Sequence, residues 1–263
     1  MSVIDEHGAK KLLDEGMFGL SCATEITVGA GHILSEYNGT LPLDGLTKLS
    51  VEAAESLSKH EGMISLEGLR ELSDAKAESL SKGQGGLWLS GLKELSDAAA
   101  ESLSNYQGEL NLGLTALSDA AAGFLAKHQG GIYLGLTELS DAAAESLSKH
   151  HDFLALDHLT EISDAAVESL SKHQGPELQL GLTELSDKGA ESLSKYQGEL
   201  LVLDNLEKIS DSAAEFLSKR KGSLSILDTM HGGLSDAAAL SLSKHKGEIN
   251  GEPAKDWFKS LGK

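Results

Sequence analysis

The segment Gly86–Gly108, GLWLSGLKELSDAAAESLSNYQG, contains the unit from which most of this chain is built. Leu87 and Leu89 are separated by Trp88, and this alternation with a period of two predicts a short strand. Gly91 follows, and we expect it to take a positive φ in the turn that leaves the strand.

The second half of the segment predicts a short helix. Leu92 and Leu95 are expected to point inward across the turn. Ser96 and Asp97 then precede an alanine-rich stretch, which is the arrangement of a capping residue and a first-turn acid. Gly108 closes the unit, as glycine commonly does after a helix.

The last leucine of this helix recurs along the chain every 22 to 25 residues, at Leu57, Leu80, Leu103, Leu125, Leu147, Leu170, Leu193, Leu217 and Leu242. Leu34 extends the series backwards, so we count about ten repeats, of which the first is degenerate. A helix this short is not stable alone, and the repeats must stack. The predicted fold is a right-handed α/β solenoid, a horseshoe with a parallel concave sheet and short convex helices.

The pattern L-x-L-x-x-L-x-x-L-S-D-x-x-x-x-x-L, seen from Leu87 to Leu103, resembles a bacterial leucine-rich repeat. The repeated wording L-S-D-A-A-A-E-S-L-S-K-H-Q-G is similar to arrays in planctomycete-like bacterial proteins. The sequence departs from the common pattern because it lacks the asparagine ladder. The resemblance covers about residues 18–247 and implies a protein-binding scaffold; it carries over no catalytic residues.

The two ends are expected to cover the open stack. Residues 3–15 are predicted to form a helix in an N-terminal helical cap, residues 1–17. Residues 253–261 predict a helix that starts at Pro253, with Trp257, Phe258 and Leu261 on one face, in a C-terminal helical cap, residues 248–263. The leucine-rich repeats occupy residues 18–247.

Composition limits the possible functions. The chain has 22 Lys+Arg against 41 Asp+Glu, a net charge of −19, which argues against nucleic acid as a partner. We expect no membrane association, because no apolar run is long enough to span a bilayer. We expect a cytoplasmic location, because no signal peptide is recognised, and a monomer. The single cysteine, Cys22, lies in the glycine column of the degenerate repeat and is expected to be semi-buried.

The residue between the two strand leucines varies from repeat to repeat, whereas the rest of the unit is nearly copied. This strand column contains Ser65, Trp88, Asn111, Tyr133, Ala155, Gln179, Val202 and Ser225. Trp88 and Tyr133 are two of only eleven aromatic residues, and such side chains are enriched among interface hot spots. We predict that the strand column binds a protein or peptide, with ordinary strand propensity as the alternative explanation.

Acidic residues flank this surface. Glu94 and Glu138 belong to a column before the second turn leucine that also holds Glu71, Glu161 and Glu184. The strand side adds Glu67, Asp157, Asp204 and Asp228. We therefore predict a basic or neutral partner; an acidic face kept for solubility is the alternative.

Histidines share one column near the helix ends, namely His60, His128, His150, His173 and His245, which alternate with Tyr37, Tyr106 and Tyr196. The column also holds Gly83 and Arg220, so we predict no metal site and expect these histidines to bond carbonyls in the last helical turn. Serine and aspartate recur in nearly every repeat, which indicates structural roles. We predict no catalytic residues and no cofactor.

The predicted function is thus a non-catalytic protein- or peptide-binding scaffold that uses the concave sheet face. Two alternatives remain: a structural or self-assembling repeat element, and an accessory repeat region of a larger enzyme or signalling protein.

Overall fold

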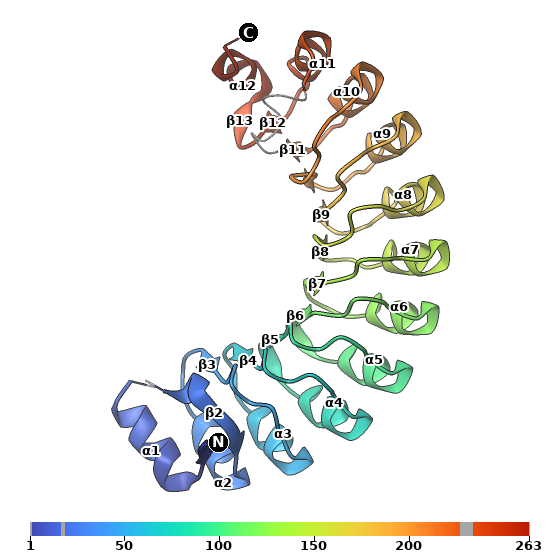
Figure 1. The fold of residues 1–263 in the computed structure, drawn as a ribbon. Coiled ribbons are helices and arrows are strands. Elements are labelled where there is room, and N and C mark those ends of the chain that lie inside the picture. Colours follow the sequence, from blue (N-terminus) through green and yellow to red (C-terminus); the bar gives the residue numbers. More distant parts are fainter. Residues whose placement is uncertain (1, 17–18, 227–233, 263) are drawn as a thin grey trace. The chain divides into compact units, whose positions relative to one another are not determined.

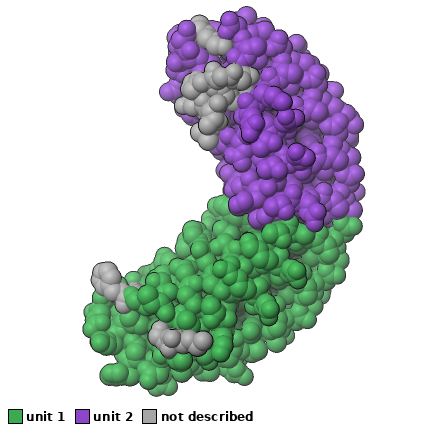
Figure 2. Space-filling model, viewed as in Figure 1, with its two compact units in different colours: residues 1–134 green, residues 135–263 purple. Residues whose placement is uncertain are grey.

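The structure, a computed structural model, describes residues 2–16, 19–226 and 234–262. The chain forms two compact units, residues 1–134 and residues 135–263, coloured green and purple in Figure 2.

Unit 1, residues 1–134, alternates short strands with short helices. Its elements are β1 (Ser2–Ile4), α1 (Glu6–Asp14), the 3-10 helix η1 (Leu20–Cys22), β2 (Ala23–Ile26), α2 (Val28–Ser35), β3 (Leu41–Pro42), α3 (Val51–Leu57), β4 (Ile64–Ser65), α4 (Asp74–Leu80), β5 (Gln84–Leu89), α5 (Asp97–Leu103), β6 (Gln107–Leu112), α6 (Asp119–Leu125) and β7 (Ile132–Leu134).

Unit 2, residues 135–263, continues the same alternation. Its elements are α7 (Asp141–Leu147), β8 (Leu154–Leu156), α8 (Asp164–Leu170), β9 (Glu177–Leu180), α9 (Asp187–Leu193), β10 (Leu200–Val202), α10 (Asp211–Ser218), β11 (Ser223–Ser225), α11 (Asp236–Leu242), β12 (Glu248–Ile249), β13 (Glu252–Pro253) and α12 (Ala254–Ser260).

Within each unit the strands pair in chain order, and the helices lie to one side of them (Figure 1). The pairs from β3 to β7 and from β8 to β12 that join neighbouring repeats within a unit are parallel. The helices α2 to α11 occupy the predicted repeat positions, and Leu34 of the degenerate first repeat is fully buried. The predicted α/β leucine-rich-repeat solenoid is confirmed.

The core of each unit consists of leucine and alanine layers between strand and helix. In the central repeat of unit 1, Leu87, Leu89, Leu92 and Leu103 are all 0 % exposed. Leu95, also predicted to point inward, is only half-buried. The helix side of this core is made of alanines and leucines, such as Ala99, Ala100 and Leu103 in α5.

The turn glycine has a different role from the one predicted. Gly91 does not adopt a positive φ; Gly85 and Gly108, at the starts of strands, do. A Cβ at Gly91 would lie 1.9 Å from the carbonyl oxygen of Glu67 in the preceding repeat. Glycine is needed here because the two backbones touch, and the prediction of a positive φ was wrong.

In six of the repeats the helix-capping serine also ties its helix to the preceding repeat. Ser118 Oγ accepts a hydrogen bond from Ala121 N–H at 3.0 Å and donates one to Asp97 Oδ1 at 2.5 Å. The same serine-to-aspartate bond joins Ser96 to Asp74, Ser163 to Asp141, Ser186 to Asp164, Ser210 to Asp187 and Ser235 to Asp211. The L-S-D tripeptide therefore caps one helix and links two.

The N-terminal end differs from the predicted helix over residues 3–15. Residues 2–4 form β1, which pairs in parallel with β2, and α1 begins only after Asp5, whose side chain caps it through Gly8 N–H. At the other end, α12 starts after Pro253 as predicted and buries Ala254 and Trp257, whereas Phe258 is only half-buried.

Candidate functional site

The strand column is a continuous row within each unit. In unit 1, the register places Ser65 opposite Trp88, Trp88 opposite Asn111, and Asn111 opposite Tyr133. In unit 2 the corresponding row is Ala155, Gln179, Val202 and Ser225. The repeat spacing therefore aligns the variable residues on the sheet face turned away from the helices.

The members of the row differ in how much surface they offer. Trp88, Asn111, Tyr133 and Gln179 are half-buried, as is Ser225. Ser65 is 6 % exposed, Ala155 1 % and Val202 6 %, so these three contribute almost no contact area. Available side chains in unit 1 are therefore concentrated from Trp88 to Tyr133.

Trp88 has an unusual environment for an indole. Its Nε1–H is shielded from water and finds no hydrogen-bond acceptor in the described part of the chain. An unsatisfied buried donor costs about 1–3 kcal/mol. The Trp88 N–H group therefore makes no hydrogen bond that stabilises the described part of the fold.

Carboxylates from one repeat bond to strand-column side chains of the next. The Ser225 hydroxyl donates to Asp204 Oδ1 at 2.7 Å, and Ser65 donates to Asp44. Asp157 accepts a bond from Gln179; burial raises the pKa of Asp157, while His158 and the Gln179 bond partly oppose this rise. The sequence showed acids near this face but gave no sign of the bonds, because their partners lie about one repeat away. Asp228, also expected here, lies outside the described residues.

The glutamates of the acidic flank are exposed to solvent. Glu71 and Glu94 in unit 1 are exposed, as are Glu138, Glu161 and Glu184 in unit 2. Glu184 forms an ion pair with Lys208 of the next repeat at 2.7 Å. The other four carboxylates give the side of the sheet a negative charge.

The histidine column forms a buried ladder between repeats. Nε2 of His60 lies 2.8 Å from the carbonyl of Gly39, Nε2 of His128 lies 2.7 Å from that of Gly108, and Nε2 of His173 lies 2.9 Å from that of Asp152. Tyr106, Tyr196 and Arg220 make equivalent bonds to Gln84, Gly175 and Gly198. These side chains bond carbonyls of the preceding repeat, whereas the sequence had suggested carbonyls of their own helix.

Rings in this ladder stack on one another in unit 2. The ring centroids of His150 and His173 are 6.0 Å apart, as are those of His173 and Tyr196. The guanidinium carbon of Arg220 lies 5.1 Å from the centroid of the Tyr196 ring. Burial, with a smaller contribution from the neighbouring His150, lowers the pKa of His173 to about 4. Burial also lowers the pKa of Arg220 to about 10, so Arg220 stays charged at neutral pH. His173 is therefore neutral at neutral pH, and the ladder side chains brace the loops of neighbouring repeats.

Cys22 is exposed, contrary to the expectation of a semi-buried thiol. Later members of its column, such as Gly91, are in close contact with the backbone of the preceding repeat. Cys22 belongs to the first repeat, which has no preceding repeat to cover it.

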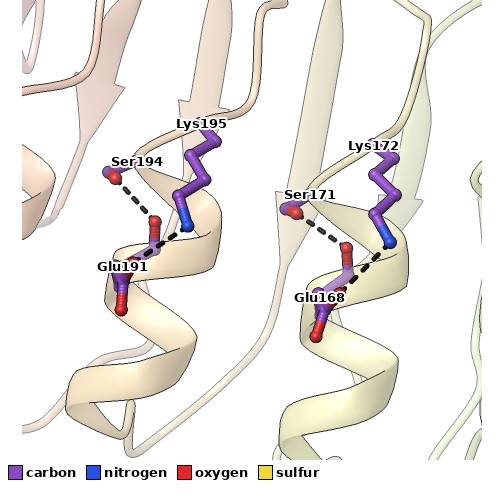
Figure 3. A network of polar contacts seen from close by, with 6 residues as sticks. All are labelled: Glu168, Ser171, Lys172, Glu191, Ser194 and Lys195. Atoms are coloured by element: carbon purple, nitrogen blue, oxygen red, sulfur yellow. Dashed lines mark hydrogen bonds and ion pairs between the residues drawn. The ribbon is translucent and has the colours of Figure 1, made fainter.

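On the helical side, exposed Glu–Lys pairs line the helices. Figure 3 shows α8 and α9, where Lys172 lies 3.3 Å from Glu168 and Lys195 lies 2.9 Å from Glu191. The hydroxyls of Ser171 and Ser194 donate to the backbone carbonyls of the same glutamates. Such pairs contribute only about 0.3–0.5 kcal/mol each. They support the helices and do not form a site.

No helix in the described part of the chain combines the length and apolar character needed to cross a bilayer.

No family model and no curated protein matches the chain. Among solved structures it is similar to an internalin from Listeria monocytogenes, with 14 % sequence identity and a TM-score of 0.47, over 89 % of this chain and 82 % of that one. The leucine-rich-repeat fold follows from the repeated strand–helix units themselves.

Proposed function

We propose that this chain is a non-catalytic scaffold that binds a protein or peptide on the sheet face of its strands. The observation that carries the proposal is the row Trp88, Asn111, Tyr133. A chain that copies its repeat closely places a tryptophan and a tyrosine at the position that the architecture leaves free.

The spacing of this row suits an extended segment. Neighbouring strands lie about 4.8 Å apart, so the backbones of Trp88 and Tyr133, two strands apart, are separated by about 10 Å. Asn111 between them supplies an amide with both donor and acceptor groups. A preformed surface of this kind loses little conformational freedom on binding.

Gln179 is the corresponding adaptable side chain on the row of unit 2. It is half-buried and already bonded to Asp157. A ligand amide could take the place of the Gln179 side chain as the hydrogen-bond donor to Asp157. It would then bind a carboxylate that is already partly shielded from water. We propose that this row contributes polar contacts, whereas Trp88 and Tyr133 supply apolar anchoring.

The partner is proposed to be basic or neutral. Glu94 in unit 1 and Glu138 in unit 2 are exposed carboxylates on the flank of the sheet, and neither forms an ion pair in the described part of the chain. An acidic partner would be repelled there, and long-range attraction would favour lysine or arginine side chains.

The test is a peptide selection with a matched pair of variants. Phage-displayed peptides are selected on the wild-type protein, and their affinities are measured by isothermal titration calorimetry. W88A/Y133A is expected to weaken binding at least tenfold, because truncated aromatic hot spots cost this much or more. E94Q and E138Q are each expected to weaken binding less and to reduce its dependence on salt.

The control removes two aromatic side chains from the helices. Phe124 in α6 and Phe216 in α10 are half-buried beneath Lys127 and Lys219. F124A/F216A should bind the selected peptides as the wild type does. Equal affinity for W88A/Y133A and the wild type, with both folded by circular dichroism, would contradict the proposed surface.

A further inference from the structure

The ends of α10 and α11 enclose a basic hollow in this acidic chain. The hollow has a volume of about 610 Å³, and its lining includes Lys219, Arg220, Lys221, Lys244 and Lys246. Among the described residues that line it, Glu215 is the one acid. Since the whole chain carries a net charge of −19, five cationic side chains around one depression are a marked local reversal of sign.

Two of these lysines depart from the repeated sequence. The residue before the loop glycine is Asn38 and Glu61 in the first two repeats, and it is glutamine in five later ones, at Gln84, Gln107, Gln129, Gln174 and Gln197. In the last two repeats it is Lys221 and Lys246. Lys219 and Lys244 belong to the lysine column present in most repeats. At this position a positive charge stabilises the helix by interacting with the negative end of its dipole. Lys221 and Lys246 are therefore additional charges that helix stability does not require.

A third departure removes the acid that would neutralise Lys244. The helix position occupied by Glu191 in α9 and Glu215 in α10 is Leu240 in α11, and this leucine is 51 % exposed. Lys219 is paired with Glu215 at 2.9 Å. In contrast, Lys221, Lys244 and Lys246 form no ion pair within the described residues, although the charge of Lys244 acts on Glu215 at longer range.

The hollow between α8 and α9 provides a comparison within the same unit. It has a volume of about 520 Å³ and a lining that includes Glu168, Lys172, Glu191 and Lys195. Both of these lysines are engaged by glutamates of their own helices (Figure 3). With Lys188, the described lining of the α8–α9 hollow has three lysines against two glutamates, whereas that of the α10–α11 hollow has five Lys or Arg residues against one glutamate, so the excess of positive charge is much larger at α10–α11.

We infer that the hollow between α10 and α11 binds an acidic segment of a protein partner, with carboxylates held by Lys221, Lys244 and Lys246 and an apolar side chain placed on Leu240. Charge complementarity selects the occupant. Leu240, which is exposed on α11 four residues before Lys244, favours a peptide over a small inorganic anion. The site lies on the helical side of unit 2 and is distinct from the row Trp88, Asn111, Tyr133.

The experiment uses the full chain and a fluorescein-labelled peptide of aspartate and glutamate with one central leucine, followed by fluorescence anisotropy at low salt. K221Q/K246Q restores the glutamine of the earlier repeats and is expected to weaken binding about fivefold or more. L240E restores the missing acid, and we expect it to weaken binding by a similar factor because it pairs with Lys244 and repels the peptide.

Matched controls locate the effect. K172Q/K195Q, in the α8–α9 hollow, also removes two positive charges and should leave affinity within twofold of the wild type, as should W88A/Y133A. Equal losses for K172Q/K195Q and K221Q/K246Q would show that only net charge matters and would overturn the site. No detectable peptide binding by the wild type would overturn it as well.

Two further probes test other anionic occupants. A single-stranded oligonucleotide and vesicles of anionic phospholipid are expected to bind more weakly than the peptide, and a peptide with Asn and Gln in place of the acids should not bind. Tighter binding of the oligonucleotide or the vesicles, with the same loss in K221Q/K246Q, would overturn the assignment to a protein segment.

Discussion

Gly91 and Gly123 lie in opposite environments, and a methyl group added to each should have opposite effects. A Cβ at Gly91 would meet the Glu67 carbonyl oxygen at 1.9 Å, whereas a Cβ at Gly123, within α6, would meet nothing within 4 Å. We expect G91A to lose about 1–3 kcal/mol of unfolding free energy through overpacking. G123A should gain about 0.5–1 kcal/mol from helix propensity. Urea denaturation followed by circular dichroism measures both; a G91A protein as stable as the wild type would contradict the close approach.

His173 makes the stability of the protein depend on pH. Burial lowers the pKa of its imidazole from 6.5 to about 4, so the unfolded chain binds a proton that the folded chain rejects between these values. The contribution of His173 is fully present above pH 6.5 and is lost as the pH falls toward 4. The loss amounts to about 3 kcal/mol.

The matched variant for this prediction is H173Y. The ladder already accepts tyrosine at Tyr106 and Tyr196, and neither ring gains a proton in this range. The difference in melting temperature between pH 7 and pH 4.5 should therefore be smaller for H173Y than for the wild type. Identical pH profiles would show that carboxylates alone govern the acid response.

At the scale of the element, the bond between the capping serine and the preceding aspartate can be added where it is missing. Val51 occupies the aspartate position of α3, and Ser73, which caps α4, makes no side-chain capping bond. V51D gives Ser73 the acceptor that Asp74 gives Ser96. It also places an acid at a helix N-terminus. We expect a gain of about 0.5–1.5 kcal/mol.

A double-mutant cycle separates the two effects in V51D. The helix-dipole contribution survives in V51D/S73A, whereas the serine–aspartate bond does not. A coupling energy near zero between the two positions would contradict the bond. Thermal denaturation of the four proteins supplies the comparison.

The elements themselves were predictable because each repeat carries its own local signals. The alternation Leu87, Trp88, Leu89 and the Ser96–Asp97 cap predicted β5 and α5 directly. The ladders were not predictable in the same way. The partner of Ser118 or His128 is a group about one repeat earlier in the chain, and only the strand register brings the two together. The strand column was located from its variability, but the burial of Ser65 and Ala155 was not, since the side chains of neighbouring repeats determine it.

At the scale of the whole molecule, stacking one acidic repeat many times accumulates repulsion. Exposed glutamates such as Glu71 and Glu94 recur at the repeat spacing, and the chain carries a net charge of −19. Four exposed i,i+4 pairs, from Glu145–Lys149 to Glu215–Lys219, oppose this with only about 0.3–0.5 kcal/mol each.

Salt should therefore stabilise the protein. At about 0.15 M ionic strength the Debye length falls to about 8 Å, which screens charges in adjacent repeats more than it screens the contact pairs. We expect the melting temperature to rise between about 10 mM and about 150 mM sodium chloride and then to level off, because the remaining repulsion acts over distances already screened. The variant E71Q/E94Q removes two stacked carboxylates and should start with a higher melting temperature and respond less to salt. A melting temperature that falls as salt is added would mean that the Glu–Lys pairs outweigh the repulsion between repeats.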